Sequence, residues 1–206
     1  MYNESTHPLV KHKLTVLRNA VTRHKQFREL VSEITMLLGY ESMKELDIEP
    51  LQVETPLAGT VGARLKNDIV IIPILRAGVG MLDGMLNLVP NARVGFMGIY
   101  RDHETKEPVT YYEKLPQDLH APSFFIIDPM LATGGSIIST IDVLKERGFD
   151  DITVIAILSA PEGIKSVEEA HPDVKIYTGS IDECLDENKF IVPGLGDAGD
   201  RLFGTK

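Results

Sequence analysis

The sequence predicts an α/β fold in which a parallel sheet has helices on both faces. Short runs of consecutive apolar residues, rather than alternating ones, indicate strands that are buried on both sides. Longer polar stretches with helical character separate these runs, and that order is typical of crossover connections in a parallel sheet. Neither a tandem repeat nor a Pro/Gly/Ser linker divides the 206 residues, so we expect one domain over residues 1–206.

The first predicted element is a helical segment from Leu9 to about Leu38. Apolar residues recur there at helical spacing, with charged residues between them: Leu14, Leu17, Val21, Phe27, Leu30, Ile34 and Leu37. Such a stripe is typical of core packing or of dimer packing, and both alternatives stay open. Gly39 is expected to end the helix.

Short apolar runs then mark the predicted strands. These runs are DIVIIPIL (68–75), RVGFMGIY (93–100), SFFIID (123–128), ITVIAILSA (152–160) and VKIYTG (174–179). Pro73 has no amide hydrogen to give to a ladder, so we expect the first strand to end or bend near it. Ligands of parallel sheets gather beyond the carboxyl ends of the strands, so the residues after each run are the candidates for function.

Composition excludes several classes of protein. A net charge of −9 argues against a protein that coats nucleic acid. Cys184 is the single cysteine, which excludes an internal disulfide and fits a reducing compartment. No apolar run approaches the roughly 20 residues of a membrane span, and no signal-peptide pattern opens the chain. We therefore expect a soluble, cytoplasmic protein with no nucleic-acid or membrane partner.

The loop after the third apolar run has the features of a phosphate site. In DPMLATGGSI a loop turns into a helix at four small residues, Thr133, Gly134, Gly135 and Ser136. Glycines let the backbone approach an anion, and a helix N-terminus adds about half a positive charge. Asp128 suits the vicinal hydroxyls of a ribose, so the loop fits a ribose 5-phosphate. An ordinary helix with Ser136 as its N-cap is the alternative.

Other nucleotide and metal motifs do not fit. GVGMLDG, residues 78–84, is one residue too long for the dinucleotide motif, and Tyr100 and Arg101 stand where its acidic residue would be needed. The sequence has no G-x-x-x-x-G-K-[ST] motif. The six histidines lie too far apart, without neighbouring carboxylates or cysteine, to indicate a zinc or iron site.

Four segments together resemble the type I phosphoribosyltransferases, and within them the uracil phosphoribosyltransferase family. FFIIDPMLATGGS resembles the phosphoribosyl-pyrophosphate motif, PILRAGVGM the pyrophosphate loop, YRDHET a second arginine loop and IVPGLGDAGDRLFGTK the uracil-binding segment. Pro129 replaces the second acid of the usual motif, a departure that the uracil branch shares. Phe190 stands where this family commonly has tyrosine.

The resemblance implies the reaction of uracil with phosphoribosyl pyrophosphate, giving UMP and pyrophosphate, with Mg²⁺ as cofactor. The implied donor-binding residues are Arg76, Arg101, Asp128, Pro129, Met130, Leu131, Ala132, Thr133, Gly134, Gly135, Ser136 and Asp197. The implied uracil-binding residues are Ile191, Gly196, Asp197 and Ala198. The catalytic residues would be Arg76, Arg101 and Asp197.

These implied roles agree with the chemistry of the side chains. The planar donor forks of Arg76 and Arg101 suit a departing pyrophosphate, and a surface ion pair is the alternative for each. Mg²⁺ prefers oxygen ligands, so Asp128 and Asp197 are the candidates, with the donor substrate expected to supply most of the coordination. The resemblance also makes a non-proline cis peptide near Arg76 plausible.

Residues 102–116 are predicted to form a β-hairpin that covers the site as a hood, and dimer contacts are the alternative role. We expect a homodimer or larger homo-oligomer, and GTP stays open as an effector. An RNA-binding attenuation regulator of a pyrimidine operon, built on the same fold, is the alternative function. The acidic net charge and the absence of a Lys/Arg cluster disfavour that regulator.

Overall fold

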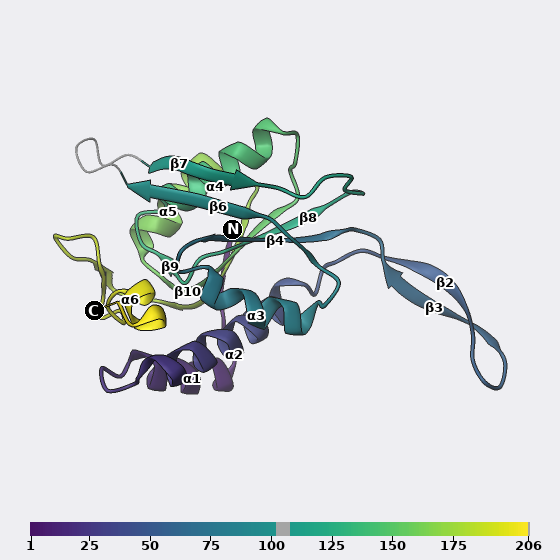
Figure 1. The fold of residues 1–206 in the computed structure, drawn as a ribbon, viewed down its shortest axis with the longest axis horizontal. Helices are drawn as coiled ribbons and strands as arrows, with labels where there is room; N and C mark the ends of the chain where they lie inside the picture. The colour runs from purple at the N-terminus through teal and green to yellow at the C-terminus, as the bar shows by residue number, and fades with distance from the viewer. Residues whose placement is uncertain (102–107, 206) are drawn as a thin grey trace.

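A largely parallel sheet forms the centre of the protein (Figure 1). The computed structural model describes residues 1–101 and 108–205. The longer strands of the sheet are β1 (Tyr2–Glu4), β4 (Ile69–Leu75), β6 (Phe96–Arg101), β7 (Pro108–Lys114), β8 (Ser123–Ile127), β10 (Ile152–Ser159) and β11 (Lys175–Ile181). Their order is β1-β11-β10-β8-β4-β6-β7. Neighbours from β1 to β6 run parallel, and β7 pairs antiparallel with β6, so the predicted parallel sheet is confirmed.

Helices cover both faces of this sheet, as the sequence predicts. One face carries α1 (Pro8–Arg18), α2 (His24–Ser42), α3 (Val79–Leu88) and α6 (Ala198–Phe203), and the other carries α4 (Gly135–Glu146) and α5 (Pro161–Ala170). Alternate side chains of each buried strand enter the two cores. On β4, Ile69 and Ile71 pack with α1 to α3, while Val70 and Ile72 pack with α4 and α5. Continuous apolar runs are therefore needed for burial on both sides.

Two strand predictions need correction. The run at 93–100 forms two pieces, β5 (Arg93–Val94) and β6, which meet at Gly95. A side chain there would clash, since an added Cβ would lie 2.6 Å from Ile72 Cδ1. The expectation that the first strand ends or bends near Pro73 is wrong, because β4 continues to Leu75 and Pro73 is in register with Ile127 of β8. On the other side of β4, residues 70–71 pair with β5 and residues 74–75 pair with β6. Pro73 lies between these two pairings, where no ladder hydrogen bond is required of it.

The N-terminal helical segment consists of two helices rather than one. Between α1 and α2 the chain turns at residues 19–23. Gly39 does not end α2, which continues to Ser42. Its role is close packing: a Cβ at residue 39 would lie 2.8 Å from Met85 Sδ and 3.1 Å from Leu88 Cδ2 of α3. Close contact between two helices thus explains this glycine better than a helix end.

A long hairpin projects from the body of the protein (Figure 1). Its strands are β2 (Ile48–Glu54) and β3 (Gly59–Leu65), paired antiparallel along their whole length. The sequence analysis did not predict this hairpin. Within the described residues, no helix is both long and apolar enough to cross a membrane.

Candidate active site

The loop between β8 and α4 is fixed at both ends by the sheet. The short strand β9 (Met130–Leu131) pairs with β10, and the carbonyl oxygen of Pro129 accepts hydrogen bonds from Ile157 N (3.1 Å) and Leu158 N (3.0 Å). On its outer side the loop contacts the start of α5, where a Cβ on Gly163 would lie 2.3 Å from the Ala132 carbonyl oxygen. The loop therefore has a rigid support on two sides.

The start of α4 does not have Ser136 as its N-cap, which was the alternative prediction for this loop. The N-cap is Gly134, whose φ of 85° lies in the left-handed region, and α4 begins at Gly135. Ser136 is already inside the helix, so the N-cap reading of Ser136 is wrong. Gly134 has no side chain with which to cap the helix. Amides at the start of a helix are groups that can bind an anion.

A cavity of about 150 Å³ lies over this helix start. It is lined by Asp128, Met130, Leu131, Ala132, Thr133, Gly134, Gly135, Ser136 and Ile137. Each predicted residue of the loop is thus at the cavity, except for Pro129, which is buried. The geometry is that of a small anion site at the carboxyl edge of a parallel sheet.

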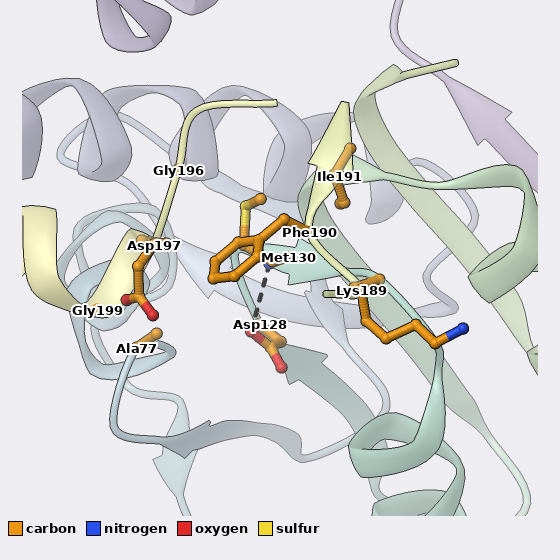
Figure 2. Close-up of a pocket in the computed structure, with 11 residues that line it drawn as sticks. Ala77, Asp128, Met130, Lys189, Phe190, Ile191, Gly196, Asp197 and Gly199 are labelled. Carbon is orange, nitrogen blue, oxygen red and sulfur yellow. Dashed lines mark hydrogen bonds between the residues drawn. The ribbon is translucent and has the colours of Figure 1, made fainter. Parts of the chain in front are cut away.

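A second cavity, of about 240 Å³, adjoins the first. It is lined by Ala77, Asp128, Met130, Ala132, Lys189, Phe190, Ile191, Gly196, Asp197, Ala198 and Gly199 (Figure 2). The two cavities share Asp128, Met130 and Ala132. The second cavity is closed mainly by the segment after β12 (Cys184–Leu185), in which β13 (Ile191–Val192) leads into α6. We call residues 191–197 the base turn.

Asp128 stands where the two cavities meet. The residue is half-buried, and its Oδ1 accepts a hydrogen bond from Met130 N at 3.3 Å (Figure 2). Desolvation of the carboxyl group raises its pKa to about 7, against the smaller opposing effect of this hydrogen bond. Near neutral pH the group therefore exists in both protonation states, and it can donate to a hydroxyl or accept from one.

Asp197 faces the second cavity from the start of α6 (Figure 2). It is the N-cap of this helix, and its Oδ1 accepts a hydrogen bond from Asp200 N at 2.8 Å. The same residue lines a neighbouring cavity of about 420 Å³ together with Phe190, Gly196 and Arg201. Asp197 thus combines a structural bond with exposure to the site.

The two predicted arginines lie at strand ends of the same edge. Arg76 follows β4 on an exposed loop, and the peptide bond between Leu75 and Arg76 is cis, which confirms that expectation. Ala77, rather than Arg76, lines the second cavity. Arg101 is the last residue of β6, but its side chain lies outside the described residues.

The predicted hood is described only at its base. β6 and β7 pair as an antiparallel hairpin, in which the rings of Tyr100 and Tyr111 lie 6.1 Å apart. Residues 102–107, at its tip, lie outside the described residues. The hairpin itself is therefore confirmed, and its covering of the site stays a prediction.

Comparison with known proteins decides the family. The model of the uracil phosphoribosyltransferase family matches residues 4–205. The chain belongs to this family. A uracil phosphoribosyltransferase of Streptococcus pneumoniae is 56% identical over 97% of this chain and 96% of its own length. One from Streptococcus suis is 55% identical over 98% and 97% of the two chains.

A solved structure has the same overall fold. The structure of a protein from Aquifex aeolicus has a TM-score of 0.93 and 40% sequence identity, and the match covers 100% of this chain and 99% of that one. The two chains therefore share one α/β fold over their whole length.

Ala77 and Lys189 are among the cavity residues that the sequence analysis did not predict as site residues. Ala77 lines the second cavity beside Asp197, and Lys189 lines it from the opposite side (Figure 2). Lys189 has a positive φ of 67°, which turns the chain just before Phe190. A basic residue directly before the predicted base segment was the available signal for Lys189, whereas nothing local distinguishes Ala77.

The raised pKa of Asp128 predicts how the stability of the protein depends on pH. Its folded pKa of about 7 lies above the ordinary value of 3.8, so the protein loses stability as pH rises through this interval. Asp128→Asn removes this loss. We expect Asp128→Asn to have a higher free energy of unfolding than the wild type at neutral pH. The difference should grow from pH 4 to pH 7, reach roughly 2–4 kcal/mol, and then stay constant.

Denaturant unfolding of the substrate-free protein at several pH values measures this difference. Asp150→Asn, at an exposed aspartate, is the control and should give a flat difference across the same range. A flat profile for Asp128→Asn as well would contradict the desolvation of Asp128.

Proposed function

We propose that this protein transfers the 5-phosphoribosyl group of phosphoribosyl pyrophosphate to uracil, giving UMP and pyrophosphate. The main support is the arrangement of the two adjoining cavities, which share Asp128, Met130 and Ala132. One has the helix start that suits a phosphate, and the other has the base turn. A ribose that spans the shared residues would join a phosphate in the first cavity to a base in the second. The relatives at 55–56% identity, named uracil phosphoribosyltransferase, support the same reaction.

The donor is held by backbone groups and one carboxyl group. The amides of Gly135 and Ser136 and the dipole of α4 stabilise the 5-phosphate. Asp128 bonds the ribose hydroxyls, and as it is partly protonated near neutral pH it adds little repulsion toward the anionic donor. The 5-phosphate is thereby held without a cationic side chain.

The base is recognised by the backbone of Ile191, Gly196 and Ala198. Uracil presents an acceptor, a donor and an acceptor along one edge, which a fixed turn can match with N–H and C=O groups. Cytosine would place an amine against an N–H donor and leave a buried group unpaired, at a cost of roughly 1–3 kcal/mol. Phe190 closes the cavity beside the turn (Figure 2).

The leaving pyrophosphate gains negative charge as the bond to the sugar breaks. Arg76 and Arg101 stabilise this charge at the ends of β4 and β6. Asp128 and Asp197 line one cavity, and this pair of carboxylates fits Mg²⁺, which commonly takes one or two carboxylates and oxygens of a phosphorylated substrate. When bound, the ion would supply positive charge toward the pyrophosphate. The hairpin of β6 and β7 covers the reacting sugar and excludes water.

Further proposals concern the state of the protein in the cell. Residues 1–206 act as one domain in the cytoplasm. The protein forms a homodimer or larger homo-oligomer, and GTP is its candidate effector. The projecting hairpin supports association of copies, because Ile48, Leu57 and Val61 on it are exposed apolar residues. The RNA-binding regulator is not favoured, since the matched relatives are named as the enzyme.

A spectrophotometric assay of UMP formation tests the reaction directly. With Mg²⁺ and phosphoribosyl pyrophosphate, we expect turnover with uracil and at least about tenfold lower kcat/KM with cytosine, because one unpaired group separates the two. Hypoxanthine is a second control, and it exceeds uracil in size. Equal rates with all three bases, or none with uracil, would contradict the proposal.

Gly134 tests the phosphate loop. A Cβ there would point toward α5, 3.1 Å from the Gly163 carbonyl oxygen, and φ is 85°, so Gly134→Ala must move the loop. We expect a rise of at least about tenfold in KM for phosphoribosyl pyrophosphate, with a smaller change for uracil. Gly148→Ala is the matched control, since its φ is 83° and nothing lies within 4 Å of its added Cβ. If both variants keep the wild-type KM, the loop does not hold the phosphate.

Two substitutions of Asp197 test its structural role and its chemical role separately. Asp197→Asn keeps an N-cap for α6 and removes the charge, whereas Asp197→Ala also removes the cap. Both should lower kcat at least about tenfold, equal to about 1.4 kcal/mol. Only Asp197→Ala should also lower the free energy of unfolding, by about 1 kcal/mol. A normal kcat for Asp197→Asn would show that the charge is not needed.

A further inference from the structure

The base turn is held from outside the cavity by a salt bridge that the reaction does not use. Its apex is Gly194, which is buried and has a positive φ of 58°. A Cβ on this residue would lie 2.0 Å from the Ile191 carbonyl oxygen, so the turn closes tightly on itself. Ile191 and Gly196, on either side of the apex, line the second cavity. The position of the apex therefore sets the spacing of the groups that face the base.

Arg18 and Asp182 form this salt bridge. Arg18 is the last residue of α1, and Asp182 follows β11, 164 positions later in the chain. The guanidinium binds the carboxylate with both ends: Nη1 donates to Oδ2 at 2.6 Å and Nη2 donates to Oδ1 at 2.5 Å. The Asp182 side chain is only 3% exposed and that of Arg18 is 24% exposed. Such bidentate geometry fixes both partners in orientation.

Both backbone groups of Gly194 are bonded to this pair. Nη1 of Arg18 donates to the Gly194 carbonyl oxygen at 2.9 Å, and Gly194 N donates to Asp182 Oδ2 at 2.8 Å. A buried N–H or C=O group without a partner is unfavourable, so the orientation of this peptide segment depends on the salt bridge. Three groups from α1, the end of β11 and the base turn form one closed set of hydrogen bonds.

The charge of Asp182 is stable in this place. Burial acts to raise its pKa, but the hydrogen bonds from Arg18 and Gly194 more than offset this and lower the pKa below its ordinary value. Without Arg18 the carboxylate would be buried with no guanidinium to balance it. Loss of either partner should therefore disturb the other and the glycine between them.

A second arginine anchors the next residue of the turn without using the side chains of Arg18 and Asp182. Arg201 Nη1 donates to the Leu195 carbonyl oxygen at 2.9 Å, and its Nη2 donates to the Asn19 carbonyl oxygen at 2.7 Å. The guanidinium also lies 4.4 Å from the centre of the Phe27 ring. Loss of the Arg18–Asp182 salt bridge would consequently loosen the apex while this anchor stays in place.

We propose that Arg18 and Asp182 are positioning residues for base recognition, an inference that rests on the proposed function. They do not line either cavity of the site, and they act by fixing Gly194 and thus the backbone between Ile191 and Gly196. The phosphate loop is anchored separately, through the Pro129 carbonyl oxygen to β10. The salt bridge should therefore affect the affinity for uracil and the discrimination between bases far more than the affinity for the donor.

Steady-state kinetics of the full chain test this division. Arg18→Met removes the charge and keeps the length of the side chain. We expect KM for uracil to rise at least about tenfold and KM for phosphoribosyl pyrophosphate to change less than about threefold. The preference for uracil over cytosine should fall by at least about fivefold, because a loosened turn no longer penalises the wrong edge. Arg18→Lys keeps the charge without the fork and should lie between Arg18→Met and the wild type.

Lys145→Met is the matched control. Lys145 of α4 forms a 2.7 Å salt bridge with Asp173 and is 25% exposed, close to the value for Arg18, but it lies away from the base turn. It should leave both KM values and the base preference unchanged. Assays are run at a temperature where circular dichroism shows each variant folded, so that loss of stability is measured apart from loss of recognition.

The outcomes distinguish failure of the proposed function from failure of the positioning role of Arg18 and Asp182. No uracil turnover in the wild type would refute the proposed function itself. Given wild-type turnover, the inference is overturned if Arg18→Met raises both KM values in parallel, or lowers only the melting temperature. It is also overturned if Arg18→Met fails to fold and Arg18→Lys, when folded, shows the wild-type KM for uracil and the wild-type base preference.

Discussion

Burial of β4, β8 and β10 on both faces is the constraint on which the rest of the structure depends. Each of these strands gives alternate side chains to two cores, so few polar residues are tolerated along them. Polar chemistry is therefore confined to the segments that follow the strands. Since the strands are parallel, these segments meet at one edge of the sheet, where Arg76, Asp128 and the start of α4 are found.

The two acidic residues of the second cavity illustrate how environment separates similar groups. Asp128 comes directly after a buried strand, and desolvation raises its pKa to about 7. Asp197 begins α6, and its Oδ1 accepts a hydrogen bond from Asp200 N. The two acidic residues of one cavity thus differ in setting, since one follows a buried strand directly and the other stands at a helix start.

Sequence reasoning succeeded where the signal is local. Consecutive apolar residues gave the buried strands, and adjacent small residues gave the loop before α4, because both patterns are set by neighbours in the chain. It failed where tertiary packing decides: Gly39 serves the contact with α3, and Pro73 lies within β4 between two pairings. The β2–β3 hairpin was missed because it contributes no side chain to either core, so neither burial nor a continuous apolar run marks it. The role of the base turn could be predicted only through resemblance, since this turn offers mostly backbone groups.

The apex of the base turn joins the two ends of the polypeptide. Arg18 belongs to the first helix, whereas Gly194 lies twelve residues before the end of the 206-residue chain. During synthesis the strands and the phosphate loop leave the ribosome well before the base turn does. An incomplete chain that stops before residue 191 would contain the whole donor loop and no base turn. The salt bridge that fixes the apex therefore forms only after residue 194 has been synthesised, although Arg18 leaves the ribosome early.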